Sequence, residues 1–421
     1  MTITQKNSDT EKVIIVGVGL KSEKMADIKE SLFELEELVY AAGGEVVGAL
    51  TQQLEKFQSA TLLGSGKLEE VKTLIEETES EVVVVDHVLT GIQSRNLEEK
   101  WQVRVLDRAQ LILDIFALRA KTYEGKLQVE LAQKMDMLPR MVGGWHGSLS
   151  RLAGGIGTRG PGESALEIDR RRARESIIVI KKKLEKVRNS RAQHRAKRNR
   201  QKIPRFALIG YTNSGKSTLL NLLTKSKVLS KDQVFATLDP TTRKLYLPEI
   251  GDAIITDTVG FIRKLPTHLI EAFKATLEES GDADILLHVV DLSNDQMQLQ
   301  VDVVEKLIQE FGWDKLPIIH VFNKKDKASP EKQFQIKQSP RVFISAMTGD
   351  GLPELKNMMI EEVKKLSQQV VLYFSKSDEH RLYDLKREAK ITHSEPGPQG
   401  TLVTALLTEV QLQKWSDFID H

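Results

Sequence analysis

The chain has 421 residues, which is enough for about two or three domains that each bury a core of their own. Hydrophobic residues make up 40% and charged residues 29%, a composition typical of a folded protein and not of a disordered one. Cysteine is absent, which excludes disulfides, thiol catalysis and iron–sulfur clusters and agrees with a reducing compartment. The polar start lacks the apolar segment of a secretion signal, and no apolar run is long enough to span a bilayer. We therefore expect a cytoplasmic protein without a transmembrane segment.

The net charge of +2 hides one strongly basic stretch. Residues 170–205 hold 16 Lys and Arg against 2 Asp and Glu, which leaves the rest of the chain acidic. A dense positive segment on an acidic body indicates a polyanionic partner bound at one place, with a solvated helix face as the alternative.

Residues 12–108 alternate short apolar strands with helical patterns, which predicts a small parallel sheet covered by helices. A strand followed by a helix is expected within residues 60–78. Gly17 and Gly19 lack the third glycine of a dinucleotide fingerprint, and residues 64–67, GSGK, lack the upstream glycine of a phosphate loop. We interpret the GSGK segment as a turn that opens a helix.

A helical pattern over residues 108–139 precedes a glycine-rich segment. Residues 143–162 contain eight glycines in twenty positions, with an aromatic, a histidine and two arginines among them. Glycine loses the most entropy on ordering, so this segment is either a flexible linker or a tip that orders against a partner, and we favour the tip.

The basic stretch that follows has a helical pattern of its own. Its apolar positions alternate spacings of four and three, which indicates a seam against another helix, and a hairpin with the preceding helix would satisfy it. These apolar positions are Ala173, Ile177, Ile180, Leu184 and Val187. The residues expected to contact the polyanionic partner are Trp145, His146, Arg151, Arg159, Arg170, Arg171, Arg172 and Arg174.

Residues 210–217, GYTNSGKS, follow an apolar strand and open an apolar helix, which is the context of a P-loop. Backbone N–H groups and the helix N-terminus would hold phosphates there. Lys216 is expected to reach the β- and γ-phosphates, and Ser217 is expected to ligate Mg²⁺.

Three later segments, each after a predicted strand, favour guanine as the base. In residues 257–260, DTVG, the Asp257 carboxylate suits a water-mediated contact to Mg²⁺, and the Gly260 N–H suits the γ-phosphate. In residues 323–326, NKKD, the Asp326 carboxylate can accept both the N1–H and the N2 amine of guanine. A backbone N–H of residues 345–347 can meet guanine O6.

Between the P-loop and residue 257, residues 235–242 contain three threonines that compete as a further Mg²⁺ ligand in a first switch loop. The full set of expected nucleotide-binding residues is Gly210, Tyr211, Thr212, Asn213, Ser214, Gly215, Lys216, Ser217, Phe235, Ala236, Thr237, Leu238, Asp239, Asp257, Thr258, Val259, Gly260, Asn323, Lys324, Lys325, Asp326, Ser345, Ala346 and Met347.

The position after the DTVG segment departs from Ras-like proteins, where a glutamine orients the attacking water. Phe261 stands there and cannot hydrogen-bond, so we expect slow intrinsic hydrolysis unless another group positions the water. Asn213 is a candidate, either by helping to bind K⁺ or only by stabilising the loop.

Residues 370–421 show a β-α-β-β-α pattern with a hairpin turn at 396–400 and no chemical constellation. The whole pattern predicts an α/β fold with four parts: an amino-terminal parallel α/β domain (1–108), a helical hairpin arm with a Gly-rich tip and basic helix (109–203), a Ras-like P-loop GTPase domain (204–367) and a small α+β domain (368–421).

The P-loop, FATLDPTTR, DTVGFIRKLP and NKKD motifs, with the GGWHGSLSRLAGGIGTRGPGE segment and the arginine-rich helix, resemble the HflX family of the Obg–HflX group of GTPases. The resemblance covers nearly the whole chain. It implies GTP hydrolysis, GTP-dependent binding to the large ribosomal subunit and its RNA, and separation or rescue of stalled ribosomes under stress. It also implies that Thr237 is the magnesium-binding threonine and that Lys216, Thr237 and Asn213 serve hydrolysis, Asn213 with K⁺.

Two other functions stay open at this point: a GTP-gated binding module in which hydrolysis only resets docking, and a ribosome-assembly or RNA-processing GTPase. The sequence does not give the oligomeric state, and we favour a monomer.

Overall fold

The computed structural model describes residues 10–141, 165–199, 203–224, 234–235, 238, 240–264, 266, 269, 281, 283–407 and 409–419. The chain forms two compact units, one drawn mainly from residues up to Val187 and the other mainly from Arg188 onward. Among the helices within these ranges, none has the length and apolar character needed to cross a bilayer.

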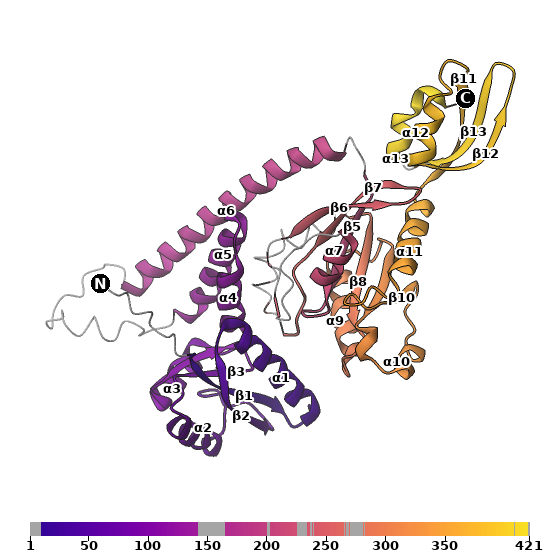
Figure 1. Ribbon diagram of the computed structural model, residues 1–421. Coiled ribbons are helices and arrows are strands. Elements are labelled where there is room, and N and C mark those ends of the chain that lie inside the picture. The colour runs from indigo at the N-terminus through magenta and orange to yellow at the C-terminus, as the bar shows by residue number, and fades with distance from the viewer. Residues whose placement is uncertain are drawn as a thin grey trace, which may run out of the picture. The chain divides into compact units, whose positions relative to one another are not determined.

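The first unit contains a four-stranded parallel sheet with strand order β2-β1-β3-β4 (Figure 1). Its strands are β1 (Lys12–Leu20), β2 (Glu45–Leu54), β3 (Val82–Val85) and β4 (Arg104–Asp107). Its helices are α1 (Met25–Ala42), α2 (Ser65–Thr78), α3 (Gly91–Trp101), α4 (Arg108–Arg119) and α5 (Tyr123–Arg140).

Helices cover both faces of this sheet, because successive side chains of each strand point to opposite faces and both sets are apolar. Ile14, Val16 and Val105 share a core with Leu68 of α2 and Leu97 of α3, so these helices cover one face. Helices α1 and α4 pack against one another and contact strands of the same sheet. The amino-terminal parallel α/β fold expected from the sequence is therefore confirmed.

Three details differ from the sequence reading. Helix α3 was not foreseen, although Thr90 and Gln93 form a capping box at its start, a pattern that is visible in the sequence. Residues 60–63 form no strand, and only an isolated bridge pairs Gln58 with Leu62. The helical pattern of 108–139 is divided between α4 and α5, because the Thr122 side chain caps a new helix start. Helix α2 does begin at the GSGK turn, as expected.

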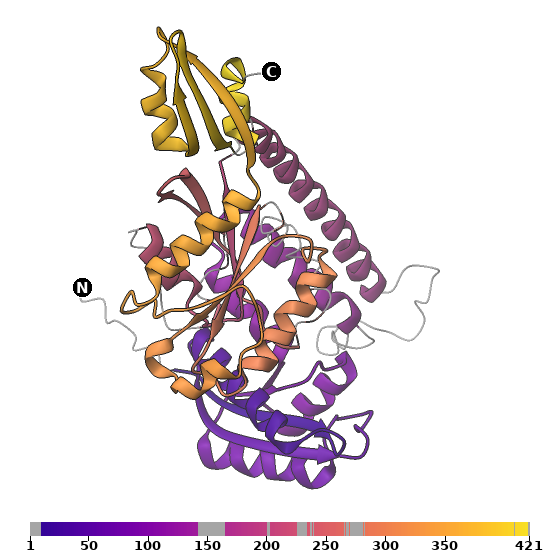
Figure 2. The same cartoon turned by 90° about the vertical axis from the view of Figure 1, so that its right-hand side faces the viewer.

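Helix α6 (Ala165–Asn199) is a single helix of 35 residues (Figures 1 and 2). Ala173 and Ile180 are buried, and Ile177, Leu184 and Val187 are partly buried. All five positions of the expected seam are therefore at least partly covered, while most residues between them are exposed.

The second unit begins with a six-stranded sheet of order β10-β9-β8-β5-β7-β6, in which only the β6–β7 pair is antiparallel. Its strands are β5 (Arg205–Gly210), β6 (Thr241–Leu247), β7 (Gly251–Asp257), β8 (Ile285–Asp291), β9 (Ile318–Asn323) and β10 (Arg341–Phe343). The described helices are α7 (Lys216–Thr224), α9 (Met297–Glu310), η2 (Lys325–Lys327), α10 (Pro330–Phe334) and α11 (Leu352–Lys365).

The carboxyl-terminal residues form an antiparallel sheet of order β11-β13-β12 (Figure 2). Its elements are β11 (Gln368–Ser375), α12 (Arg381–Glu388), β12 (Lys390–Pro396), β13 (Gly400–Leu407), α13 (Glu409–Lys414) and η3 (Ser416–Phe418). The β-α-β-β-α order and the hairpin turn agree with the sequence reading, and the α/β fold class is confirmed. The four-part domain division stays a prediction.

Candidate nucleotide-binding site

The loop between β5 and α7 makes a turn that tolerates no side chain at two positions. Gly210 has a φ of +148°, and a Cβ there would lie 2.2 Å from the Val289 carbonyl oxygen. Gly215 has a φ of +92°, and a Cβ there would lie 2.2 Å from Asn323 Nδ2. The two glycines of the motif are therefore required by the backbone conformation and by close neighbours.

Lys216 is the first residue of α7 and its side chain is buried. Its Nζ donates to the carbonyl oxygens of Gly210 at 3.1 Å and Tyr211 at 2.7 Å. Burial lowers the pKa of Lys216 to about 8, and the nearby Asp257 carboxylate opposes this shift. Because charged phosphate oxygens accept hydrogen bonds more strongly than carbonyls do, a bound polyphosphate would compete for this ammonium.

Ser217 and Asp257 bring two kinds of oxygen together at the end of β7. Ser217 Oγ donates to Asp257 Oδ2 at 2.6 Å, and the Asp257 carboxylate is fully buried. Mg²⁺ prefers oxygen ligands, so this hydroxyl–carboxylate pair fits the ion that GTPases require.

Much of the first switch loop lies outside the described residues, and Ala236, Thr237 and Asp239 are among the residues that the structure does not describe. Phe235 and Leu238 are described, and both side chains are buried.

Thr258 and Val259 are both buried behind the site. The Thr258 hydroxyl donates to the Leu208 carbonyl oxygen at 2.7 Å, so it ties β7 to β5. The hydroxyl of this expected site residue is thus used within the fold.

The segment after β7 is joined to the P-loop through its backbone. Phe261 N donates to the Gly210 carbonyl oxygen at 3.0 Å, and Thr212 N donates to the Phe261 carbonyl oxygen at 2.7 Å. A Cβ at Gly260 would lie 2.9 Å from Thr212 Cα and 3.0 Å from Lys216 Nζ, so the two loops touch. Phe261 is only 2% exposed, so its side chain packs within the protein and does not face solvent.

Asn323 connects two loops through the two ends of its amide. Its Nδ2 donates to the Ser214 carbonyl oxygen at 2.9 Å, and its Oδ1 accepts from the Ala346 N–H at 2.9 Å. The next residue, Lys324, is left-handed with a φ of +61°, and its Nζ lies 2.8 Å from Asp291 Oδ2. Asn323 and Lys324 therefore join the end of β9 to the P-loop, to the 345–347 loop and to the end of β8.

Asp326 lies in η2, where its side chain is exposed and makes no hydrogen bond to the described residues. Lys325 Nζ instead pairs with Asp350 at 2.7 Å. Ser345 is buried and its Oγ accepts from Thr348 N at 3.3 Å, whereas Met347 is 79% exposed.

The sequence reading missed two features of this site. Asp291 ends β8 and pairs with Lys324, and the rule that strand ends gather at one edge would have found it. His288 and His320 lie side by side on β8 and β9 with ring centroids 5.4 Å apart. Burial, then His320 and then Lys216, lower the pKa of His288 to about 3.

The expected RNA-contacting residues divide into two groups. Trp145, His146, Arg151 and Arg159 lie outside the described residues. On α6, Arg171, Arg172 and Arg174 are exposed and Arg170 is partly exposed.

The sheet order, the glycine turn and the loops gathered at the carboxyl ends of the strands define a Ras-like P-loop nucleotide-binding domain. Three family models match consecutive parts of the chain: "GTP-binding GTPase N-terminal" over 29–117, "GTP-binding GTPase Middle Region" over 119–198 and "50S ribosome-binding GTPase" over 205–324.

The chain is similar over most of its length to curated relatives named GTPase HflX. It is 44% identical to the one from Caldanaerobacter subterraneus subsp. tengcongensis, over 98% of this chain and 94% of the relative. It is 48% identical to the one from Lacrimispora saccharolytica, over 90% of this chain and 88% of the relative. A GTP-binding protein from Sulfolobus solfataricus, crystallised with GDP, aligns with a TM-score of 0.44 and 23% identity over 85% of this chain and all of that one.

The chain therefore belongs to the GTPase HflX family, and the resemblance stated from its motifs is confirmed. It is a GTPase. The roles of the individual site residues stay predictions.

Proposed function

We propose that this GTPase binds the large ribosomal subunit in its GTP-bound state and separates or rescues stalled ribosomes under stress. The observation that carries the proposal is α6, whose apolar seam is at least partly covered while Arg171, Arg172 and Arg174 are exposed. Ribosomal RNA is a polyanion that such a surface suits. The family-model description over 205–324 supports the same partner. The protein would act as a monomer among ribosomes in the cytoplasm.

In this proposal the phosphates of GTP lie against the N–H groups of residues 211–217, with Lys216 on the β- and γ-phosphates. Ser217 and Thr237 would hold Mg²⁺, with Asp257 acting through water. Mg²⁺ bound there neutralises charge on the phosphates. The Gly260 N–H would meet the γ-phosphate, since Gly260 already lies against the P-loop.

The base would lie between the NKKD and 345–347 loops. The exposed Asp326 carboxylate would accept from guanine N1–H and N2–H, and a backbone N–H of residues 345–347 would donate to O6. Asn323 and Lys324 would keep this pocket in register with the P-loop through the contacts described above.

A bound K⁺ near Asn213 is the second element of the proposal. Asn213 has a φ of +59°, so alanine at this position would add backbone strain and glycine would not. Asn213→Gly thus removes the side chain and preserves the turn. If Asn213 helps to bind K⁺, GTP turnover is faster in KCl than in NaCl at equal ionic strength, and the variant removes this difference. Equal turnover in both salts would contradict the K⁺ role.

The buried Phe261 favours a second candidate, a GTP-gated binding module in which hydrolysis only releases the protein. Ribosome splitting with a non-hydrolysable GTP analogue separates the two candidates. A single round that proceeds as fast with the analogue as with GTP supports the module, whereas splitting that requires GTP supports hydrolysis as the driving step.

Sucrose-gradient sedimentation of purified ribosomes tests the main proposal. We expect free subunits to increase with GTP and not with GDP. A variant with Arg170, Arg171, Arg172 and Arg174 changed to Ala should lose the effect. A matched control with Lys24, Lys29, Lys56 and Lys72 changed to Ala, all exposed and outside α6, should keep it. Unchanged ribosomes with every nucleotide, together with precursor particles accumulating in cells that lack the protein, would favour the assembly function instead.

A further inference from the structure

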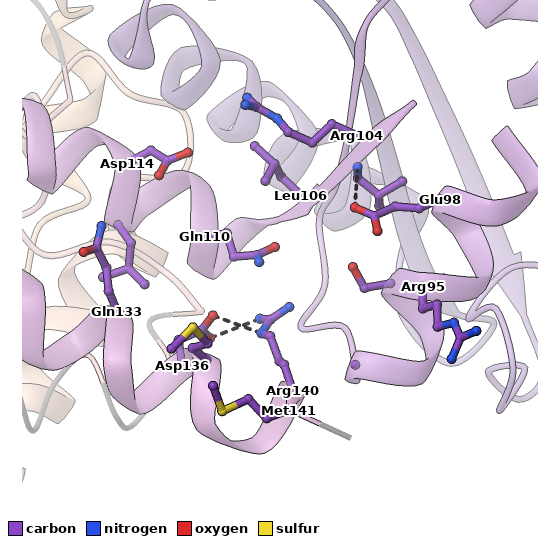
Figure 3. A pocket seen from close by; sticks show the side chains of 15 residues that line it. Arg95, Glu98, Arg104, Leu106, Gln110, Asp114, Gln133, Asp136, Arg140 and Met141 are labelled. Carbon is purple, nitrogen blue, oxygen red and sulfur yellow. Dashed lines mark hydrogen bonds and ion pairs between the residues drawn. The ribbon is translucent and has the colours of Figure 1, made fainter. Parts of the chain in front are cut away.

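A groove runs along the outer edge of β4, the last strand of the amino-terminal sheet. It encloses about 350 Å³ and is lined by β4 together with α3, α4 and α5. Figure 3 shows Glu98 of α3 on one side, and Asp114 of α4 and Gln133 of α5 on the other. Cavities of this size hold small ligands or a few residues of a peptide.

The backbone of β4 offers hydrogen-bonding groups to this groove. Arg104 N donates to the Glu81 carbonyl oxygen, and the parallel register pairs Arg104 with Val82 and Leu106 with Val84. In an edge strand, the backbone N–H and C=O groups of every second residue point away from the neighbouring strand. Because those of Arg104 and Leu106 point toward β3, those of Val105 point into the groove.

These two groups of Val105 are poorly satisfied. Val105 N donates to Glu98 Oε1 at 3.4 Å, which is long for a hydrogen bond (Figure 3). The Val105 carbonyl oxygen accepts no hydrogen bond from the residues that the structure describes. Val105 is itself 2% exposed, and leaving a buried backbone group unpaired is costly.

An antiparallel strand would satisfy both groups at once, because directly opposed residues can exchange two N–H···O bonds. The ligand residue opposite Val105 would place its side chain on the same face as Val105, next to α3. Its two neighbours would place theirs on the α4 and α5 side, next to Asp114.

The charges around the groove favour a basic ligand. The three arginines in its lining each have acidic partners, namely Glu99 for Arg95, Glu11 for Arg104, and Asp107 with Asp136 for Arg140. Glu98 and Asp114 have no cation within ion-pair distance among the described residues. Burial raises the pKa of Asp114, and the charge of Arg104 opposes this shift without forming an ion pair with Asp114.

We propose that this groove binds an extended segment of a partner protein that carries basic side chains and pairs with β4 as an antiparallel fifth strand. The Val105 backbone supplies the strand pairing. Glu98, released from the Val105 N–H, and Asp114 receive ammonium or guanidinium groups from the two sides of the bound segment.

The test uses the full chain and a fluorescein-labelled pentapeptide of sequence Val-Lys-Lys-Lys-Val, capped at both ends, whose neighbouring lysines point to both faces of the bound strand. Fluorescence anisotropy should show saturable binding, and the same peptide with glutamate for lysine should not bind. Two further peptides carry N-methyl groups at all odd or at all even positions. Strand pairing predicts that one pattern keeps the affinity and that the other loses at least about fivefold, since its N–H groups can no longer face β4.

Variants locate the site. Glu98→Gln and Asp114→Asn should each weaken binding about two- to fivefold, and glutamine keeps an acceptor for the Val105 N–H. Glu77→Gln, the same charge change at an exposed position of α2, should leave it unchanged. Hydrogen exchange should slow at residues 103–107 when the peptide is bound.

Three results would overturn the proposal: no binding of the basic peptide, equal loss from both N-methyl patterns, or protection confined to another surface. Unlabelled spermidine that displaces the peptide completely at equal concentration would also overturn it, because the site would then recognise charge alone.

Discussion

Asn323 connects the P-loop to the 345–347 loop by hydrogen bonds from both ends of its amide. A Cβ at Gly215 would meet that same amide, so the glycine and the asparagine depend on one another. If the 345–347 loop and the P-loop bind the base and the phosphates as proposed, Asn323 would link the two, and the residues that contact the base can be tested separately from those that hold the loops.

Asp326→Asn tests the base directly. The amide replaces one acceptor of the carboxylate with a donor, which would face the guanine N–H groups. We expect a loss of about 1.5–3 kcal/mol for GTP, about 10- to 150-fold in affinity, and a relative gain for xanthosine triphosphate. Titration with fluorescent nucleotides measures both. Asp314→Asn, an exposed change in the same unit, is the control, and unchanged GTP affinity in the Asp326 variant would refute the assignment.

His288 gives this domain a predictable sensitivity to acid. Burial holds its pKa at about 3 in the folded protein against about 6.5 when unfolded, so only the unfolded chain binds a proton in between. Stability is therefore lost as the pH falls below about 6.5. The cost is about 2 kcal/mol at pH 5 compared with pH 7.5.

His288→Leu should remove most of this pH dependence, which hydrogen exchange of the β8 amides at the two pH values can measure. His320, whose pKa burial also lowers, would retain its own smaller contribution. His380→Leu, at an exposed position, should leave the dependence as it is. A His288 variant with the full acid sensitivity would show that another group is responsible.

At the scale of elements, the strongest sequence patterns gave the right structures. Short stretches of sequence were enough to predict three of them, and the structure contains all three. They are the strand–GxxxxGKS–helix pattern, the heptad spacing of α6 and the Pro396–Gly400 turn. Helix α3 was missed because its buried positions, Gln93, Leu97 and Trp101, include a polar residue and give a weak periodic signal. The pairing of the two buried histidines depends on strand order, which no local pattern encodes, whereas the Lys324–Asp291 pair could have been expected because both residues lie at the carboxyl ends of strands.

Helix α6 carries a prediction of its own. Four exposed or partly exposed arginines at 170–174 would release counterions on binding RNA phosphates, so affinity for the large subunit should fall steeply with salt. Changing all four to Ala should make the slope of log affinity against log salt shallower by up to about 3. Co-sedimentation across a KCl series measures this slope. Nucleotide affinity of the free protein should stay the same, and an unchanged slope would mean that α6 is only a solvated face.

At the scale of the whole molecule, charge and nucleotide chemistry occupy different parts of the chain. The basic stretch lies at residues 170–205, and the P-loop begins immediately after it at Gly210. A nucleotide-dependent change at the P-loop would therefore act close in sequence to the end of α6. If α6 binds RNA as proposed, this proximity in sequence would link GTP binding directly to RNA binding.

The glycine-rich segment before α6 should separate docking from splitting. Changing Trp145, His146, Arg151 and Arg159 to Ser removes the side chains that could contact RNA and keeps the length and glycines of residues 143–162. Because only two of many positive charges are lost, the salt slope of subunit binding should change by less than about 2. Splitting should nevertheless fall at least tenfold if these side chains order against the subunit and perform the mechanical step.

Gradient sedimentation with GTP gives the splitting rate, and co-sedimentation of the same variant gives the affinity. A variant that splits ribosomes at the normal rate would show that the segment is a linker, and a variant that loses binding and splitting together would place the anchor there instead of on α6.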